Sequence, residues 1–231
     1  MSRSLFTSRE GGVSTAPYFS FNLAQHVGDD GDSVTANRAI LAGQLGLSTL
    51  SLYFMNQVHG RSVAVIDENS SADDAPDVDA LFTTLPGVAL VTLVADCIPL
   101  LMHSSRAIAA VHVGRRGLVE GVFQATLEVF IEHGITTDEI RAEIGPSICG
   151  RCYEVDEALY RDVITVIPAA ATGHKSRQGK PCLDIEAGLG SLLDIAGISW
   201  SSTNLCTMHD VGYFSYRRDG VTGRQAGVIT L

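Results

Sequence analysis

Two segments near the middle of the chain, 88–94 and 108–113, are apolar at nearly every position. A strand with one solvated face alternates apolar and polar residues, whereas a strand buried on both faces reads as a continuous apolar run. These segments therefore predict strands that are covered on both sides. Because strand and helix patterns interleave elsewhere without regular spacing, the sequence favours a mixed sheet in a layered α/β arrangement over a barrel or a doubly wound fold.

Helices are predicted where an apolar stripe at helical spacing lies between a capping residue and a glycine. The predicted helices are 33–45, 118–133, 156–166 and 184–196; further strands are predicted at 62–66, 140–144 and within 204–231; turns or loops are predicted for 1–30, 69–79 and 169–181. A length of 231 residues with 45% hydrophobic content is enough for one folded domain, which we expect to span 1–231.

The charge balance excludes several kinds of partner. The chain has 26 acidic and 16 basic side chains, a net charge of -10, which argues against a nucleic acid or an anionic membrane as partner.

The longest apolar run, 88–102, contains Asp96 and Pro99 and is shorter than the roughly 20 residues of a membrane-spanning helix. Segment 1–12 lacks a signal-peptide pattern, so we expect a cytoplasmic protein whose 5 cysteines are thiols or metal ligands.

Three residues with metal-binding side chains, His59, Cys97 and His112, lie where strand signals meet glycine, proline or a charge. Two imidazoles and one thiolate suit zinc, and three protein ligands leave a fourth position open for water or substrate, as in catalytic zinc sites. The neighbouring strands could bring Cys97 and His112 together, while His59 must arrive from elsewhere. Alternatively, Cys97 is a buried core thiol and both histidines are polar groups satisfied by their neighbours.

Charged residues near these three extend the candidate site. Asp96 stands between an apolar strand and Cys97, where a carboxylate is costly unless it is paired or used, so it is a candidate orienter of a ligand or carrier of a proton. Arg116 lies at the predicted start of a helix, where arginine and free amides favour an anion, and Arg217 lies among aromatic residues. Ordinary turn, surface and core roles are the alternatives for these residues.

The remaining cysteines give a weaker signal. Cys149 and Cys152 have the Cys-x-x-Cys spacing, but a structural zinc knuckle needs a second pair, and Cys182 and Cys206 are isolated in the sequence. The pair also precedes no obvious helix start, as a thioredoxin-like motif would. We therefore interpret Cys149 and Cys152 as two unlinked thiols.

Several motifs spread over almost the whole chain resemble those of the YfiH family, also called the laccase-domain or multicopper polyphenol oxidoreductase family. These motifs are Arg9-Glu10-Gly11-Gly12-Val13-Ser14, Pro17-Tyr18, Phe21-Asn22-Leu23, His26-Val27-Gly28-Asp29, Asn56-Gln57-Val58-His59-Gly60, Asp79-Ala80-Leu81, Ala95-Asp96-Cys97-Ile98-Pro99, His112-Val113-Gly114-Arg115-Arg116-Gly117, Ile144-Gly145-Pro146, Cys152-Tyr153-Glu154-Val155 and Tyr213-Phe214-Ser215-Tyr216-Arg217-Arg218-Asp219. They occur in the family's order. One departure is Arg115, where members of the family usually have tryptophan.

The resemblance implies a layered sandwich of mixed β-sheets flanked by helices, with a metal site formed by His59, Cys97 and His112. It also implies action on purine nucleosides: phosphorolysis of adenosine, inosine and methylthioadenosine, and deamination of adenosine. Asp96 would then be a catalytic candidate, with Arg116 and Arg217 as phosphate partners and Asn22 as a polar contact. Zinc is the expected metal, and copper is a second metal that such ligands bind tightly.

Three other functions fit parts of the same pattern. The laccase name implies copper-dependent oxidation of phenols, but 7 scattered histidines without a His-x-His pair do not suit several coppers. Cys97 could instead be the nucleophile of a cysteine hydrolase or deamidase with His112 as its base, and the family's fold is similar to that of a bacterial deamidating toxin. A regulatory or scaffold module with a vestigial site is the non-enzymatic alternative.

Overall fold

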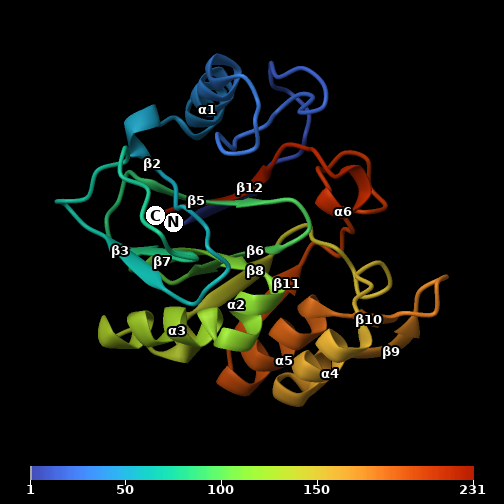
Figure 1. Ribbon diagram of the computed structural model, residues 1–231. Helices are drawn as coiled ribbons and strands as arrows, with labels where there is room; N and C mark the ends of the chain where they lie inside the picture. Colours follow the sequence, from blue (N-terminus) through green and yellow to red (C-terminus); the bar gives the residue numbers. More distant parts are fainter. Residues whose placement is uncertain (1) are drawn as a thin grey trace.

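The computed structural model describes residues 2–231 and shows two stacked β-sheets with helices on both outer sides (Figure 1). In chain order the elements are β1 (Arg3–Phe6), α1 (Gly31–Leu45), η1 (Thr49–Ser51), β2 (Leu52–Tyr53), β3 (Val63–Ile66), β4 (Ala80–Thr83), β5 (Ala89–Val94), β6 (Ile98–His103), β7 (Ile108–Val113), α2 (Arg115–Glu120), α3 (Val122–Glu132), η2 (Thr137–Glu139), β8 (Arg141–Ile144), α4 (Glu157–Val166), η3 (Pro168–Ala170), β9 (Ala171–Lys175), β10 (Pro181–Leu183), α5 (Ile185–Ala196), β11 (Ser199–Ser202), α6 (Tyr216–Asp219) and β12 (Gln225–Thr230), where η marks a short 3-10 helix.

Both large sheets are mixed. The first has the strand order β1-β12-β5-β2 and the second β11-β8-β6-β7-β4-β3, while β9 and β10 form a separate hairpin. Strand pairs β2–β5, β3–β4 and β8–β11 are parallel, and the other pairs are antiparallel. Helix α1 covers the outer face of the four-stranded sheet, and α2 to α5 lie against the six-stranded sheet (Figure 1). The predicted layered α/β fold is confirmed.

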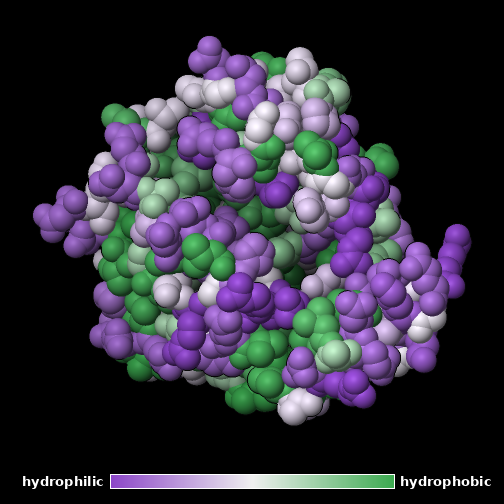
Figure 2. Space-filling view, in the orientation of Figure 1, coloured by the Kyte–Doolittle hydropathy of each residue, from purple (hydrophilic) through white to green (hydrophobic). Residues whose placement is uncertain are grey.

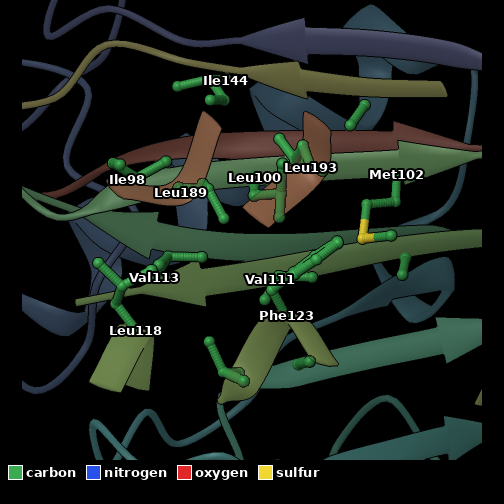
Figure 3. Close-up of a cluster of buried hydrophobic side chains, with 14 of the residues drawn as sticks. Ile98, Leu100, Met102, Val111, Val113, Leu118, Phe123, Ile144, Leu189 and Leu193 are labelled. Atoms are coloured by element: carbon green, nitrogen blue, oxygen red, sulfur yellow. The ribbon is translucent and has the colours of Figure 1, made fainter. Parts of the chain in front are cut away.

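The two apolar segments form β5 and β7, and every residue in both strands is buried. In β7, Val111 and Val113 face the helices, where they pack with Leu118 and Phe123 (Figure 3). The alternate residues of β7 face the four-stranded sheet, so that Ala110 belongs to the cluster between the sheets. Continuous apolarity in these strands therefore reflects two cores, one on each face.

The predicted helices are largely confirmed. Helix α1 is capped by the Asp30 side chain, which accepts from the Ser33 amide, and it ends at Gly46, whose φ of 71° is the left-handed conformation typical of a helix C-cap. The helix predicted at 118–133 is instead two helices, α2 and α3, because Gly121 adopts a φ of 90° between them. No α-helix within residues 2–231 is both long and apolar enough to cross a membrane.

Two other segments differ from the sequence prediction. Segment 169–181, expected to be a loop, contains β9 and the start of β10, which pair as an irregular antiparallel hairpin. Strand β1 lies in the part of the chain expected to contain only turns, and it completes the edge of the four-stranded sheet.

On the molecular face seen in Figure 2, hydrophilic residues are interspersed with smaller hydrophobic patches.

Candidate active site

The three predicted metal ligands meet where the chain crosses from one sheet to the other. Residues 95–97 connect β5 of the four-stranded sheet with β6 of the six-stranded sheet, so Cys97 lies in the crossing. His112 lies near the end of β7, beside β6, and His59 lies in the loop before β3 with a φ of 60°. Their ligand atoms all lie within 4.8 Å of one another, and Cys97 Sγ is 4.0 Å from His59 Nε2.

Gly114 lies in close contact with the side chains of this group. A Cβ atom on Gly114 would lie 3.0 Å from His59 Cδ2 and 3.4 Å from Cys97 Sγ. The two imidazole rings are nearly perpendicular, with their centroids 4.7 Å apart. Gly114 therefore makes room for the three ligands at the end of β7.

Asp79 orients the two histidines, and we did not predict this role from the sequence. Its carboxylate is completely buried, and Oδ1 is 2.7 Å from His112 Nδ1 while accepting the backbone amide of His59 at 2.9 Å. Oδ2 accepts the amide of Gly60 at 2.6 Å. Since Nδ1 of His112 faces Asp79, its Nε2 is the nitrogen available to a metal, the arrangement found behind most metal-binding histidines.

Charges within the group shift the pKa values of its members in opposite directions. Burial acts to raise the pKa of the Cys97 thiol, but the charges and hydrogen bonds of His112 and His59 outweigh burial and lower it to about 6. Burial acts to lower the pKa of His112, but Cys97 and Asp79 together raise it to about 9. At neutral pH in the metal-free protein, Cys97 is therefore largely a thiolate beside an imidazolium.

The donor set fits a borderline-soft metal ion. A thiolate and two imidazoles are ligands that zinc and copper both bind, and the buried carboxylate behind His112 fixes the direction in which its nitrogen points. With three protein ligands, a tetrahedral ion keeps one position for water or substrate. The group opens to a cavity, so this position is accessible.

The cavity beside the metal-binding group has a volume of about 410 Å³. Its lining residues are His26, Gln57, His59, Leu93, Val94, Ala95, Asp96, Cys97, His112, Ile148, Tyr153, Tyr216, Arg217 and Arg224. Two arginines and two tyrosines thus accompany the metal-binding group. Arginine suits an oxyanion, and tyrosine rings provide flat surfaces against which a heterocyclic base can stack.

Both arginines are held by backbone carbonyl groups. Arg217 donates from Nη1 to the carbonyl of Glu154 at 2.9 Å, and its guanidinium lies 5.2 Å from the centre of the Tyr153 ring. Arg224 donates from Nη1 to the carbonyls of Thr222 and Gly223, each at 2.9 Å. Each guanidinium has five N–H donors, so these contacts leave others for a ligand.

Asp96 lines the cavity but is not bonded to either histidine. Its Oδ1 accepts the Thr207 hydroxyl and its Oδ2 accepts the Arg217 amide, both at 2.6 Å. Asp96 itself has a φ of 93°, a conformation that is rare for residues other than glycine. The ligand-orienting contact considered for Asp96 is thus made by Asp79 in this structure, and Asp96 holds the start of helix α6, which carries Arg217.

The other predicted contact residues lie away from the cavity lining. Arg116 is exposed on α2 and pairs with Glu120 at 3.4 Å. Asn22 is completely buried, and its Oδ1 accepts the Arg224 amide at 2.9 Å, so its contact with the cavity is indirect. Arg115 instead borders a small neighbouring hollow, together with Cys97 and Tyr153.

Several lining residues, among them His26, Gln57 and Arg224, have no role that we predicted from the sequence. The Gln57 side chain makes two hydrogen bonds with the backbone of Leu93: Nε2 donates to the carbonyl at 2.7 Å, and Oε1 accepts from the amide at 2.8 Å. These bonds attach the loop that contains His59 to strand β5. His26 and Gln57 belong to motifs on which the family resemblance rests, so those motifs are the sequence feature that could have identified them as site residues. Arg224 lies outside those motifs and became visible only through its place in the cavity.

The fold and site define a known family. The chain belongs to the multi-copper polyphenol oxidoreductase laccase family, whose sequence profile matches residues 3–231. The family resemblance found in the sequence is therefore confirmed.

Individual relatives match nearly the full chain. A protein of Streptomyces coelicolor named purine nucleoside phosphorylase is 44% identical, over 98% of this chain and 94% of its own length. A purine nucleoside phosphorylase of Corynebacterium glutamicum is also 44% identical, over 99% and 94%. Among solved structures, the hypothetical protein YfiH of Bacillus licheniformis superposes with a TM-score of 0.93 at 29% identity, covering 100% of this chain and 92% of its own.

Proposed function

We propose that this protein is a purine nucleoside phosphorylase that uses adenosine, inosine and methylthioadenosine with phosphate, and that it also deaminates adenosine. The observation that carries the proposal is the His59, Cys97 and His112 group opening into a cavity that also holds two arginines and two tyrosines. The relatives named purine nucleoside phosphorylase support the substrate class.

His59, Cys97 and His112 would hold the metal ion, which we propose to be zinc. When bound, zinc supplies Lewis acidity that polarises a substrate atom or activates water. Asp79 keeps His112 in the tautomer that presents Nε2, and Gly114 leaves room for the ligands to converge. The family's name implies copper, but within residues 2–231 only one group of three or more such ligands contains two histidines, which does not suit a cluster of several coppers.

In phosphorolysis, a phosphate oxygen attacks the anomeric carbon of the ribose, and the bond from that carbon to the purine nitrogen breaks. The purine leaves with the electron pair of that bond and takes up a proton. Arg217 and Arg224 would bind the phosphate, and Tyr153 and Tyr216 would stack against the base. Arg116 could join the phosphate only by exchanging its pair with Glu120.

Asp96 would act at the sugar end of the cavity. Each of its carboxylate oxygens accepts one hydrogen bond from the protein and retains a further acceptor position. Asp96 can therefore accept a ribose hydroxyl or take up a proton while keeping Arg217 and helix α6 in place. In deamination, water adds to the purine carbon that bears the amine, and ammonia leaves to give inosine.

The test is to incubate the zinc-loaded protein with adenosine, inosine or methylthioadenosine, with and without phosphate, and to identify the products by chromatography. We expect free base and a ribose 1-phosphate only with phosphate, and inosine from adenosine without it. Cys97→Ala should lower kcat/KM by at least about 100-fold, since metal assistance is worth several kcal/mol. Cys182→Ala, which changes a cysteine away from this group, is the matched control. Complete inactivity of the zinc-loaded protein toward all three nucleosides would refute the proposal.

A second candidate is a cysteine hydrolase or deamidase with Cys97 as the nucleophile. The lowered pKa of Cys97 and the adjacent His112 favour it, because a thiolate beside an imidazolium is the resting form of many cysteine hydrolases. A metal chelator separates the two functions. Activity that survives chelation and is lost on alkylation of Cys97 would support the hydrolase, whereas activity that is lost with the metal and restored by zinc supports the phosphorylase.

A further inference from the structure

A second group of metal-binding side chains lies outside the candidate active site. It consists of Cys149, Cys152, Cys206 and His209, whose ligand atoms all lie within 4.8 Å of one another. The interpretation of Cys206 as isolated is therefore wrong, whereas Cys149 and Cys152 are free cysteines in the structure, as predicted. The second half of the motif is Cys206-Thr207-Met208-His209, a Cys-x-x-His sequence that follows 57 residues after the first half.

Parallel strands explain how the two halves meet. β8 and β11 pair in parallel, with Ile144 opposite Ser202, so the chain leaves both strands at the same edge of the sheet. The two exiting segments remain paired: Ser147 donates its amide to Leu205, and Thr207 donates its amide to Ser147, at 3.2 and 3.0 Å. One ligand pair follows on each segment. The convergence is thus built into the sheet rather than produced by chance contact of two surface loops.

Each half adopts a tight turn that directs both of its ligands to one side. The Cys152 amide donates to the Cys149 carbonyl at 2.9 Å, and the His209 amide donates to the Cys206 carbonyl at 3.1 Å. Across the halves, Cys152 Sγ lies 3.1 Å from His209 Nε2, and the Cys149 amide donates to Cys206 Sγ at 3.4 Å. Amide donation to a sulfur stabilises the thiolate form, which is the form that binds metals.

We propose that Cys149, Cys152, Cys206 and His209 form a structural zinc site. Three thiolates and one imidazole are a complete tetrahedral set of the kind found in structural zinc sites, with no position left for substrate. Ligand atoms about 2.0 to 2.3 Å from a zinc ion lie roughly 3.3 to 3.8 Å from one another, so a small contraction of the group suffices. Thiolate-rich sites select soft metals, and a closed zinc site has no redox chemistry of its own.

This second site would brace one wall of the catalytic cavity. Ile148 and Tyr153 directly flank the Cys-x-x-Cys turn, and both line the cavity. Thr207, between the two ligands of the other half, donates its hydroxyl to Asp96 at 2.6 Å. The Ile148 amide also donates to the carbonyl of Asp96, at 2.9 Å. Zinc bound here would thus fix the segments that position Asp96, without contacting the substrate.

Metal content of purified variants tests the site without reference to activity, so its outcome is separate from that of the proposed function. We expect about two zinc ions per wild-type chain and about one in Cys97→Ala, because each zinc site takes one ion. The double variant Cys149→Ser/Cys206→Ser should likewise retain about one, while the control Cys182→Ala retains both. A double variant that keeps the wild-type zinc content would overturn the proposal.

Cobalt binding keeps the test decisive if the double variant does not fold. Cys97→Ala leaves the second group intact, and cobalt in a site with three thiolates gives a thiolate-to-metal charge-transfer absorption in proportion to the number of sulfur ligands. We expect one equivalent of cobalt to produce this band and zinc to remove it. Absence of the band, or a disulfide between Cys149 and either Cys152 or Cys206 that survives incubation with reductant and zinc, would show that the group is not a zinc site.

Discussion

Asp79→Asn isolates the contribution of a buried carboxylate to the metal-binding group. The substitution preserves the shape of the side chain but removes its charge and one of its two acceptors. If the amide oxygen keeps the contact with His112 Nδ1, the amide nitrogen faces the backbone N–H of Gly60, which now approaches Asp79 Oδ2 at 2.6 Å. Two donors would then point at each other, and the Gly60 N–H would lose its acceptor.

Both zinc binding and folding should be weaker in Asp79→Asn than in the wild type. Loss of a carboxylate behind a metal-binding histidine typically weakens metal binding about 10- to 100-fold. That loss corresponds to roughly 1.4 to 2.7 kcal/mol of binding free energy. The unsatisfied Gly60 N–H adds a destabilisation of about 1 to 3 kcal/mol to the free energy of unfolding of the metal-free protein. Zinc affinity measured by chelator competition, and unfolding of the chelated protein by denaturant, report the two quantities separately.

Asp77→Asn is the matched control. Asp77 is exposed two positions earlier and accepts the Asn56 side chain at 2.6 Å, but it has no contact with the histidines. We expect the control to change zinc affinity by less than about 2-fold, because exposed polar contacts contribute little. Unchanged zinc affinity together with unchanged stability in Asp79→Asn would refute the reasoning, since no role would then remain for the buried carboxylate.

Further predictions concern the thiolate, the glycine contact and the arginines. In the metal-free protein, the rate at which iodoacetamide alkylates Cys97, measured by mass spectrometry, should fall to half its maximum near pH 6 rather than near pH 9, because the pKa of this thiol is lowered. Saturating zinc should abolish the reaction. Gly114→Ala should weaken zinc binding at least about 10-fold, because the added methyl group displaces the ligands. Its control is Gly43→Ala on α1, where the added methyl group meets no other atom; this variant should raise the free energy of unfolding by about 0.5 to 1 kcal/mol. Arg224→Met should lower kcat/KM for phosphate by about 10- to 100-fold, the equivalent of one charge-assisted hydrogen bond, with exposed Arg177→Met as the unaffected control.

Much of the fold could be predicted because its dominant signals are local. Two-sided burial of β5 and β7 requires continuous apolarity, and Gly46 ends α1 by the same left-handed geometry that ends helices generally. The break at Gly121 could not be predicted, because a glycine within a helix costs only about 1 kcal/mol and its φ of 90° is decided by packing. The β9–β10 hairpin is similarly hidden in a polar segment with little apolar alternation.

The site was predictable in its chemistry more than in its geometry. His59, Cys97 and His112 stand out by residue type, but Asp79 is one of several acidic residues in a polar segment, and only the pairing of β4 with β7 places it beside His112. The second metal group was missed for the same reason. The partners of Cys149 and Cys152 come from a segment that only the parallel register of β8 and β11 brings alongside.

Left-handed backbone conformations at non-glycine residues lie beside both metal-binding groups. Within residues 2–231, the non-glycine residues with positive φ are His59, Asp96 and Asn204. The first belongs to the His59, Cys97 and His112 group, the second precedes Cys97, and the third lies two residues before Cys206. Such conformations cost of order 1 to 3 kcal/mol each and persist only where the surrounding structure enforces them. Their restriction to loops that aim ligand atoms indicates that the sandwich holds those loops in place before any ion binds. An ion that bound there would meet a site already ordered by folding, which would favour tight binding.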